Sequence, residues 1–195
     1  MLWAAYQAGL ELRTEGGETR LSGRFPYGRE TVLREAGKAG PELREVFAPR
    51  AFGMRVDRRD RNVHLLAGHD FTKPMASFGS GTLDLTDTDD ALLLEARITP
   101  DMGTVSYVAD MLASIRAGLT VGLSPGFRII SSLPAAESIQ RSGNVVLRTV
   151  KDAFLEEISI VTRPAYPEAQ VEARCWQPGG TTPFTPFRPQ ITRWR

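Results

Sequence analysis

With 195 residues, 42% of them apolar and 24% charged, the chain is long enough for one domain with a buried core. Its net charge of +1 gives no reason to expect a nucleic-acid or membrane-surface partner, and its single cysteine, Cys175, excludes an internal disulfide. The sequence contains no run of ~20 apolar residues and starts without a secretory signal pattern, so we expect a cytoplasmic protein.

Short runs of alternating apolar and polar residues, separated by turn-forming residues, dominate the chain and are typical of β-strands. In chain order they predict strands over residues 19–25, 31–35, 43–47, 62–67, 81–86, 91–98, 119–130, 144–150 and 154–161. The second and third strands form one predicted hairpin, and the fifth and sixth, joined by an acidic turn, form another. Residues 71–80 and 131–143 are predicted to be loops.

One substantial helix is predicted, starting at Thr99, because a capping hydroxyl is followed there by Pro100 and an early carboxylate. Apolar residues then recur at helical spacing, namely Val105, Val108, Leu112 and Ile115. Gly118 is placed to end the helix. Its apolar face fits core packing, and the same pattern would serve a dimer interface.

These elements predict a mainly β domain with helices (α+β). A closed or nearly closed β-barrel is the expected architecture, because closure removes exposed strand edges. We expect a flexible arm over residues 1–17, one domain over 18–174 and a tail rich in proline and glycine over 175–195.

Ser124 is the first candidate for chemistry, because it lies between two glycines in a rigid apolar run, with little side-chain bulk around it. A serine hydroxyl needs a base to become nucleophilic. Gly-x-Ser-x-Gly alone is a weak signal, and here a helix precedes it and a strand follows, the reverse of the α/β-hydrolase elbow. Pro125 has no N–H, so the candidates for an oxyanion donor are the N–H of Ser124 or Gly126 and the side chains of Arg128 and Arg163.

The chain contains two histidines that could act as the base. His69 follows a predicted strand and Gly68, where an imidazole can reach a cleft and exchange a proton near neutral pH. His64 lies five positions earlier, and an odd separation on a strand places the two on opposite faces. We therefore interpret His64 as structural. Zinc is disfavoured because two such histidines and the remote Cys175 do not form a ligand set, and no cofactor is expected.

Two carboxylates, Glu156 and Glu157, interrupt an otherwise apolar strand. Burial of an unpaired carboxylate is costly, and neighbours on a strand point to opposite faces. One of the two is therefore a candidate to orient the imidazole. Asp70 is a poor candidate because it diverges from its neighbour His69.

Three blocks of the sequence, Leu65–Asp70, Gly122–Phe127 and Leu155–Pro167, together resemble the signature blocks of the HK97-type prohead proteases of tailed phages. These are capsid-maturation serine peptidases, related in fold to the herpesvirus assemblins, and the resemblance spans roughly residues 19–171. It implies a β-barrel ringed by helices, with His69 as base, Ser124 as nucleophile and Glu157, just before the Ile-Ser pair, as the acidic residue.

This chain differs from the assemblins in the third residue of the catalytic group. Assemblins use a second histidine after the serine, whereas no histidine follows Ser124 in this chain. That role must pass to an acid, with Glu157 the first choice and Glu156 the second, or it is absent.

The resemblance implies a serine endopeptidase that cleaves the major capsid protein in its scaffold region, and also itself, inside the procapsid assembling in the host cytoplasm. The resemblance also suggests a homodimer. From the composition and the residue placement described above, we expect no metal, cofactor, nucleic-acid or membrane partner. A protease of a phage-like gene transfer particle fits equally well. The alternative is a non-enzymatic capsid-assembly or scaffold-binding protein on the same fold, in which Ser124 and His69 are incidental.

Overall fold

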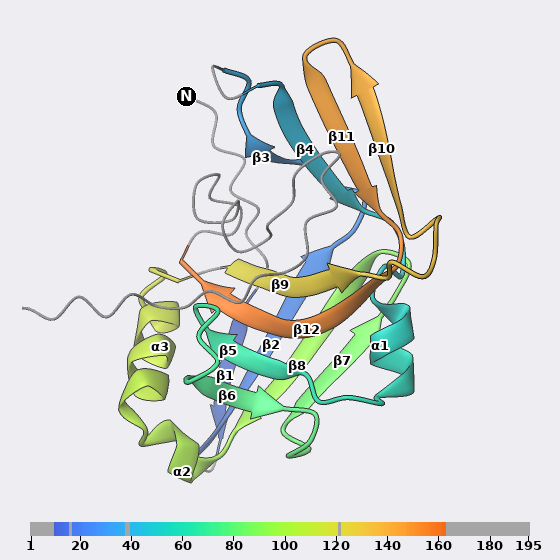
Figure 1. Cartoon of the computed structure of the whole chain (residues 1–195). Coiled ribbons are helices and arrows are strands. Elements are labelled where there is room, and N and C mark those ends of the chain that lie inside the picture. Colours follow the sequence, from blue (N-terminus) through green and yellow to red (C-terminus); the bar gives the residue numbers. More distant parts are fainter. Residues whose placement is uncertain (1–9, 16, 38–39, 121, 163–195) are drawn as a thin grey trace, which may run out of the picture.

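The computed structural model describes residues 10–15, 17–37, 40–120 and 122–162 (Figure 1). The predicted tail over 175–195, Arg163 and most of the predicted arm over 1–17 lie outside these residues. The described part of the chain is mainly β with three short helices, which confirms the predicted α+β class.

Three four-stranded sheets contain all the named strands of the described residues. The N-terminal sheet has the order β1 (Glu11–Glu15), β2 (Glu18–Pro26), β8 (Ala91–Ile98) and β7 (Leu83–Asp87). The hairpin sheet has the order β10 (Glu137–Ser142), β11 (Val145–Val150), β4 (Glu42–Phe47) and β3 (Thr31–Arg34). The central sheet has the order β6 (Pro74–Ser77), β5 (His64–Ala67), β12 (Ala153–Val161) and β9 (Gly122–Ile129).

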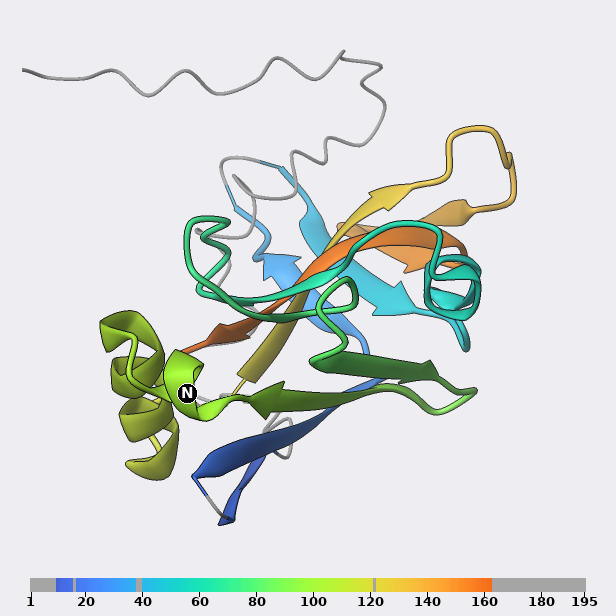
Figure 2. The ribbon, with the colours of Figure 1, turned by 90° about the horizontal axis from the view of Figure 1, so that it is seen from below.

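The three helices are α1 (Gly53–Arg58), α2 (Pro100–Gly103) and α3 (Ser106–Arg116). Helix α1 packs against β12 and β7, and α3 contacts β5. Figures 1 and 2 both place α1 and α3 at opposite sides of the molecule, with β9 and β12 crossing between them.

The predicted closed or nearly closed barrel is not confirmed, because no sheet closes in the part of the chain that the structure describes. A barrel requires the last strand of a sheet to pair with its first, but each of the three sheets is open, with end strands β1 and β7, β10 and β3, or β6 and β9. Two parallel pairings, β11 with β4 and β12 with β5, join segments that are far apart in the chain.

The two predicted hairpins are confirmed as β3–β4 and β7–β8. The predicted helix is present but broken in two. The Thr99 hydroxyl accepts a hydrogen bond from the Met102 N–H at the start of α2, the chain leaves the helix at Thr104 and Val105, and α3 follows. Gly118, with φ of +69°, lies just beyond α3 in a backbone conformation that glycine adopts without strain.

An aromatic cluster joins the three sheets in the core. The ring of Phe47 in β4 lies 5.3 Å from that of Phe25 in β2, 5.1 Å from that of Phe127 in β9 and 5.3 Å from that of Phe52 before α1. The first two contacts are edge-to-face, a favourable geometry for aromatic pairs. Phe47 thus links one strand of each sheet.

Candidate active site

A β-bulge in β12 determines which way its carboxylates point. The register against β9 shifts between Leu155 and Glu157, so Glu156 is the extra residue. Leu155, Ile158 and Ile160 all belong to the buried core. In a regular strand residues 155 and 158 would point to opposite faces, because they are an odd number of positions apart. The bulge therefore turns Glu157 and Ser159 to the face of the central sheet opposite the core.

His69 is held in a tight turn after β5. The Gly68 N–H donates to the Ile160 carbonyl at 3.1 Å, and both turn residues have positive φ, +67° for Gly68 and +62° for His69. A left-handed conformation is uncommon for a residue other than glycine, and such strain concentrates at functional sites. The His69 N–H donates to Ser159 Oγ at 2.9 Å, which helps to hold this conformation.

The imidazole of His69 pairs with the buried carboxylate of Glu157. The distance from His69 Nδ1 to Glu157 Oε1 is 2.7 Å, and the side chain of Glu157 is 5% exposed whereas that of His69 is 34% exposed. The other carboxylate oxygen, Oε2, accepts a hydrogen bond from Ser159 Oγ at 2.5 Å. A buried carboxylate with a donor on each oxygen avoids the cost of an unpaired buried charge.

Ser124 lies on β9 directly opposite Ser159 of β12. Directly opposed residues of an antiparallel pair project to the same face, so the Ser124 hydroxyl shares the face that carries Glu157 and Ser159. Ser124 is buried, with 3% of its surface exposed. Among the residues that the structure describes, Ser124 Oγ and the His69 ring are not joined by a hydrogen bond, and in unliganded enzymes such a bond is often long and tightens only with substrate.

Gly126 leaves the space that the Glu157 carboxylate occupies. These two residues are opposite each other in β9 and β12, and a Cβ added to Gly126 would lie 2.1 Å from Glu157 Oε1. The space therefore exists only because residue 126 has no side chain. The role of Gly126 as an oxyanion donor stays a prediction.

The other predicted site residues have different partners. Glu156 pairs with Arg128 at 2.6 Å and with the buried Arg55 at 3.7 Å, so both Glu156 and Arg128 are engaged away from His69. Asp70 accepts hydrogen bonds from the Thr72 N–H and hydroxyl, and the Thr72 hydroxyl holds the pKa of Asp70 below its usual value.

His64 is the first residue of β5 and lies beside Glu157 in register. Its Nε2 is 3.2 Å from Asn62 Nδ2. The parity argument that separated the two histidines assumed that both lie on one strand. That assumption is wrong, because β5 ends at Ala67 and His69 lies in the turn that follows.

Sequence reasoning assigned no role to Ser159, although a signal was present. Glu157 and Ser159 are two positions apart on an apolar strand and therefore share a face. Ser159 is fully buried, and buried hydroxyl groups need hydrogen-bond partners. A polar residue two positions from the candidate acid was thus a candidate partner for it.

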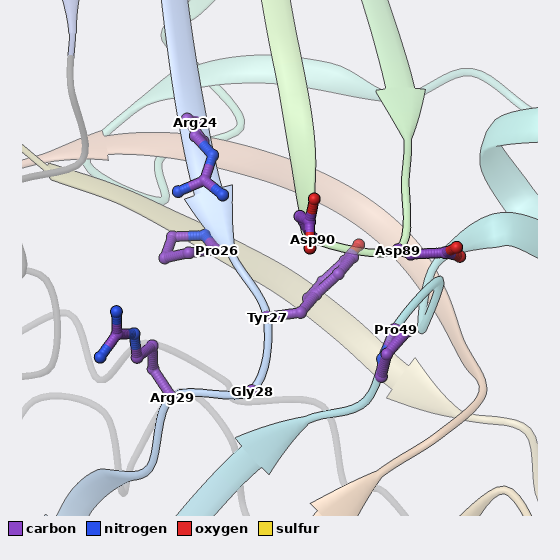
Figure 3. Close-up of a pocket in the computed structure, with 8 residues that line it drawn as sticks. All are labelled: Arg24, Pro26, Tyr27, Gly28, Arg29, Pro49, Asp89 and Asp90. Carbon is purple, nitrogen blue, oxygen red and sulfur yellow. The ribbon is translucent and has the colours of Figure 1, made fainter.

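A separate pocket of about 330 Å³ opens at the end of β2 and the β7–β8 turn (Figure 3). It is lined by Arg24, Pro26, Tyr27, Gly28, Arg29, Pro49, Asp89 and Asp90. Its charged side chains are of both signs, and none of Ser124, His69 and Glu157 contributes to it. This pocket is therefore not the site of the predicted chemistry.

Comparison with known protein families gave a match over residues 25–179 to the model described as caudovirus prohead serine protease. Comparisons with curated proteins and with solved structures gave no match. No helix within the described ranges is long and apolar enough to span a membrane. The family match covers most of the chain and includes the segments that carry His69, Ser124 and Glu157, and it confirms the resemblance inferred from the three sequence blocks. The chain belongs to the caudovirus prohead serine protease family, and its role is that of a phage capsid-maturation protease.

Proposed function

We propose that this protein is a serine endopeptidase in which Ser124 is the nucleophile, His69 the general base and Glu157 the residue that orients the imidazole. The observation that carries the proposal is the 2.7 Å contact between His69 Nδ1 and Glu157 Oε1. It lies beside the strand that bears Ser124 and within the segment matched by the family model. A base oriented by a third group is the expected companion of a nucleophilic serine.

The contact with Glu157 favours the tautomer of neutral His69 that can act as a base toward Ser124. When the Glu157 carboxylate accepts a hydrogen bond from the Nδ1–H group, neutral His69 keeps the lone pair on Nε2, the nitrogen that faces away from Glu157. In the first half-reaction, Nε2 takes the proton of the Ser124 hydroxyl while Oγ attacks the carbonyl carbon of the scissile peptide. The tetrahedral intermediate collapses, the C–N bond breaks, and the leaving amine takes the proton from His69.

The second half-reaction frees the enzyme. Water attacks the acyl ester on Ser124 and gives a proton to His69 Nε2, and the ester C–O bond breaks as the proton returns to Ser124 Oγ. The developing imidazolium is stabilised in both halves by the buried carboxylate of Glu157. The oxyanion donors stay a prediction, with Arg163 outside the described residues and Arg128 paired with Glu156.

The proposed substrate is the major capsid protein, cleaved in its scaffold region within the assembling procapsid, in accord with the prohead protease family. Removal of a scaffold segment would make room for DNA. The tail over residues 175–195 is the proposed site of self-cleavage. Ser124 is 3% exposed, and the His69 side chain, at 34%, is the more accessible of the two to a peptide.

Co-expression of the full chain with its capsid protein tests the proposal. The Ser124→Ala variant should leave the capsid protein at full length, whereas the wild type shortens it, as read by mass spectrometry of purified particles. Ser132→Ala is the matched control, because Ser132 is an exposed serine in the loop after β9, and it should process normally.

Normal processing by Ser124→Ala would reject the enzyme assignment. It would favour the alternative of a capsid-assembly or scaffold-binding protein on the same fold.

A further inference from the structure

We propose that Ser159 is a positioning residue that orients both His69 and Glu157 for the reaction of Ser124. This inference rests on the proposed function and assigns a fourth residue to the same site. Ser159 lies on β12 between the strand that carries Ser124 and the turn that carries His69. Its side chain is fully buried.

The buried Ser159 hydroxyl makes two hydrogen bonds, one as donor and one as acceptor. It has one proton to donate and lone pairs with which to accept. It donates to Glu157 Oε2 at 2.5 Å and accepts from the His69 N–H at 2.9 Å. The donor role is determined, because a backbone N–H cannot accept, and an ionised carboxylate can only accept.

Each bond constrains a different catalytic component. The bond to Oε2 leaves Oε1 directed at His69 Nδ1, which lies 2.7 Å away. The bond from the His69 N–H anchors the backbone at a residue with φ of +62°. One hydroxyl thereby fixes the acid, the backbone of the base and the angle between them.

Loss of this hydroxyl should affect the rate more than the binding of a probe. In Ser159→Ala, the carboxylate can rotate and the His69 turn can relax. The rate constant (kinact) for phosphonylation of Ser124 by a fluorophosphonate, in which fluoride leaves, should then fall by roughly 10- to 100-fold, part of the ~10²–10⁴-fold contribution of a positioned base. The inhibition constant KI should stay unchanged. The reaction is measured in procapsids assembled with the co-expressed capsid protein, with Ser77→Ala in β6 of the same sheet as the control.

A spectroscopic measurement tests the positioning itself and needs no activity. The chain has only two histidines, so ¹⁵N-histidine labelling of the full chain gives two rings, and a His64→Gln variant assigns them. The wild type and Ser77→Ala should show a downfield His69 Nδ1–H resonance protected from exchange with water. Ser159→Ala should lose it by exchange broadening, whereas a merely structural serine would leave the resonance in place when it is removed.

A third measurement uses only the wild type, in case Ser159→Ala does not fold. The His69 amide should exchange slowly with deuterium although it lies in a turn, because its N–H is bonded to a buried hydroxyl.

The outcomes separate the two proposals. If the wild type fails to react at Ser124, the proposed function fails, and the Nδ1–H resonance and the amide exchange still decide the role of Ser159. An Nδ1–H resonance that persists in Ser159→Ala, a kinact within twofold of wild type, or a fast-exchanging His69 amide would overturn the positioning role.

Discussion

Two neighbouring carboxylates in β12 have opposite surroundings, although the sequence presents them as a pair. Glu157 is buried against His69 and Ser159, whereas Glu156 is partly exposed between Arg55 and Arg128. Glu156 is itself the extra residue of the bulge, and the bulge places Glu157 on the face that carries Ser159. The two residues should therefore respond differently to the same substitution.

Glu157→Gln should lower the rate of capsid-protein processing by roughly 10²–10⁴-fold, because an amide cannot stabilise the imidazolium and favours the wrong tautomer. Glu156→Gln is the matched control and should stay within a few-fold of wild type. Rates of appearance of the shortened capsid protein measure both. If Glu156→Gln lost activity and Glu157→Gln kept it, the roles of the two carboxylates would have to be exchanged.

Gly126→Ala should disrupt the site without touching Ser124 or His69. The new Cβ would lie 2.1 Å from Glu157 Oε1, so the carboxylate must move away from the imidazole. We expect a loss of processing similar to that of Glu157→Gln and a stability cost of about 1–3 kcal/mol from overpacking. Gly103→Ala is the control, since a Cβ there meets nothing within 4 Å. Full activity in Gly126→Ala would show that the carboxylate position is not critical.

At the residue scale, local reasoning found the residue types of the site but not all of their connections. The rarity of histidine and the unusual carboxylates in an apolar strand drew attention to His69 and Glu157. The role of Ser159 and the space left by Gly126 depend on contacts across strands. The space at Gly126 requires the register of β9 against β12, and the bond from the His69 N–H to Ser159 requires the register of β5 against β12. Local patterns encode neither register.

At the scale of elements, Tyr27 joins the end of β2 to the end of β7. Its hydroxyl donates to the buried carboxylate of Asp87, and Figure 3 shows its ring directed toward the β7–β8 turn. Burial raises the pKa of Tyr27 above its ordinary value of 10.0, with the hydrogen bond to Asp87 as a second cause. Burial also raises the pKa of Asp87. The phenol therefore stays protonated in the folded protein at a pH where it ionises in the unfolded chain.

Tyr27→Phe should destabilise the fold by about 1–3 kcal/mol near neutral pH, because the Asp87 carboxylate loses a buried donor. A raised folded-state pKa stabilises the fold below pH 10 and does so less as the pH rises above it. The advantage of the wild type over Tyr27→Phe should thus shrink by about 1.4 kcal/mol between pH 9 and 11. Urea unfolding at both pH values measures it. A constant difference would mean that Tyr27 ionises equally in both states.

Strands and helices whose apolar residues recur at a regular spacing were predictable, and those without such a spacing were not. The β7–β8 hairpin has strict alternation and was found, whereas β6 begins with Pro74 and β10 is mostly polar and exposed. The single predicted helix is broken between α2 and α3 at Thr104 and Val105. An apolar period that runs from Val105 to Ile115 does not reveal such a break.

At the scale of the whole molecule, the aromatic cluster around Phe47 connects the three sheets. Phe47→Ala should cost about 3–5 kcal/mol of stability, because it removes a buried ring that contacts β2, β9 and the segment before α1. Phe71 is 64% exposed, so Phe71→Ala should change stability by less than about 0.5 kcal/mol. Equal urea midpoints for the two variants would contradict a central role for Phe47.

The overall architecture was the part least accessible to sequence patterns. A barrel was a reasonable expectation for many short strands, because it removes edges. The parallel pairings of β4 with β11 and of β5 with β12 are long-range, and alternation within a strand carries no information on its partner. The same β5–β12 pairing brings the turn that carries His69 beside Glu157, so the site depends on a long-range pairing that local patterns do not predict.

The most direct test of the account is the location of a fluorophosphonate adduct in procapsids that contain the protease. Trypsin releases Ser124 in the peptide of residues 117–128, where it is the only serine. We predict an adduct on this peptide in the wild type and its loss in both Ser124→Ala and His69→Ala. An adduct on another serine, or unchanged labelling of Ser124 in His69→Ala, would contradict a reaction in which these two side chains share one proton.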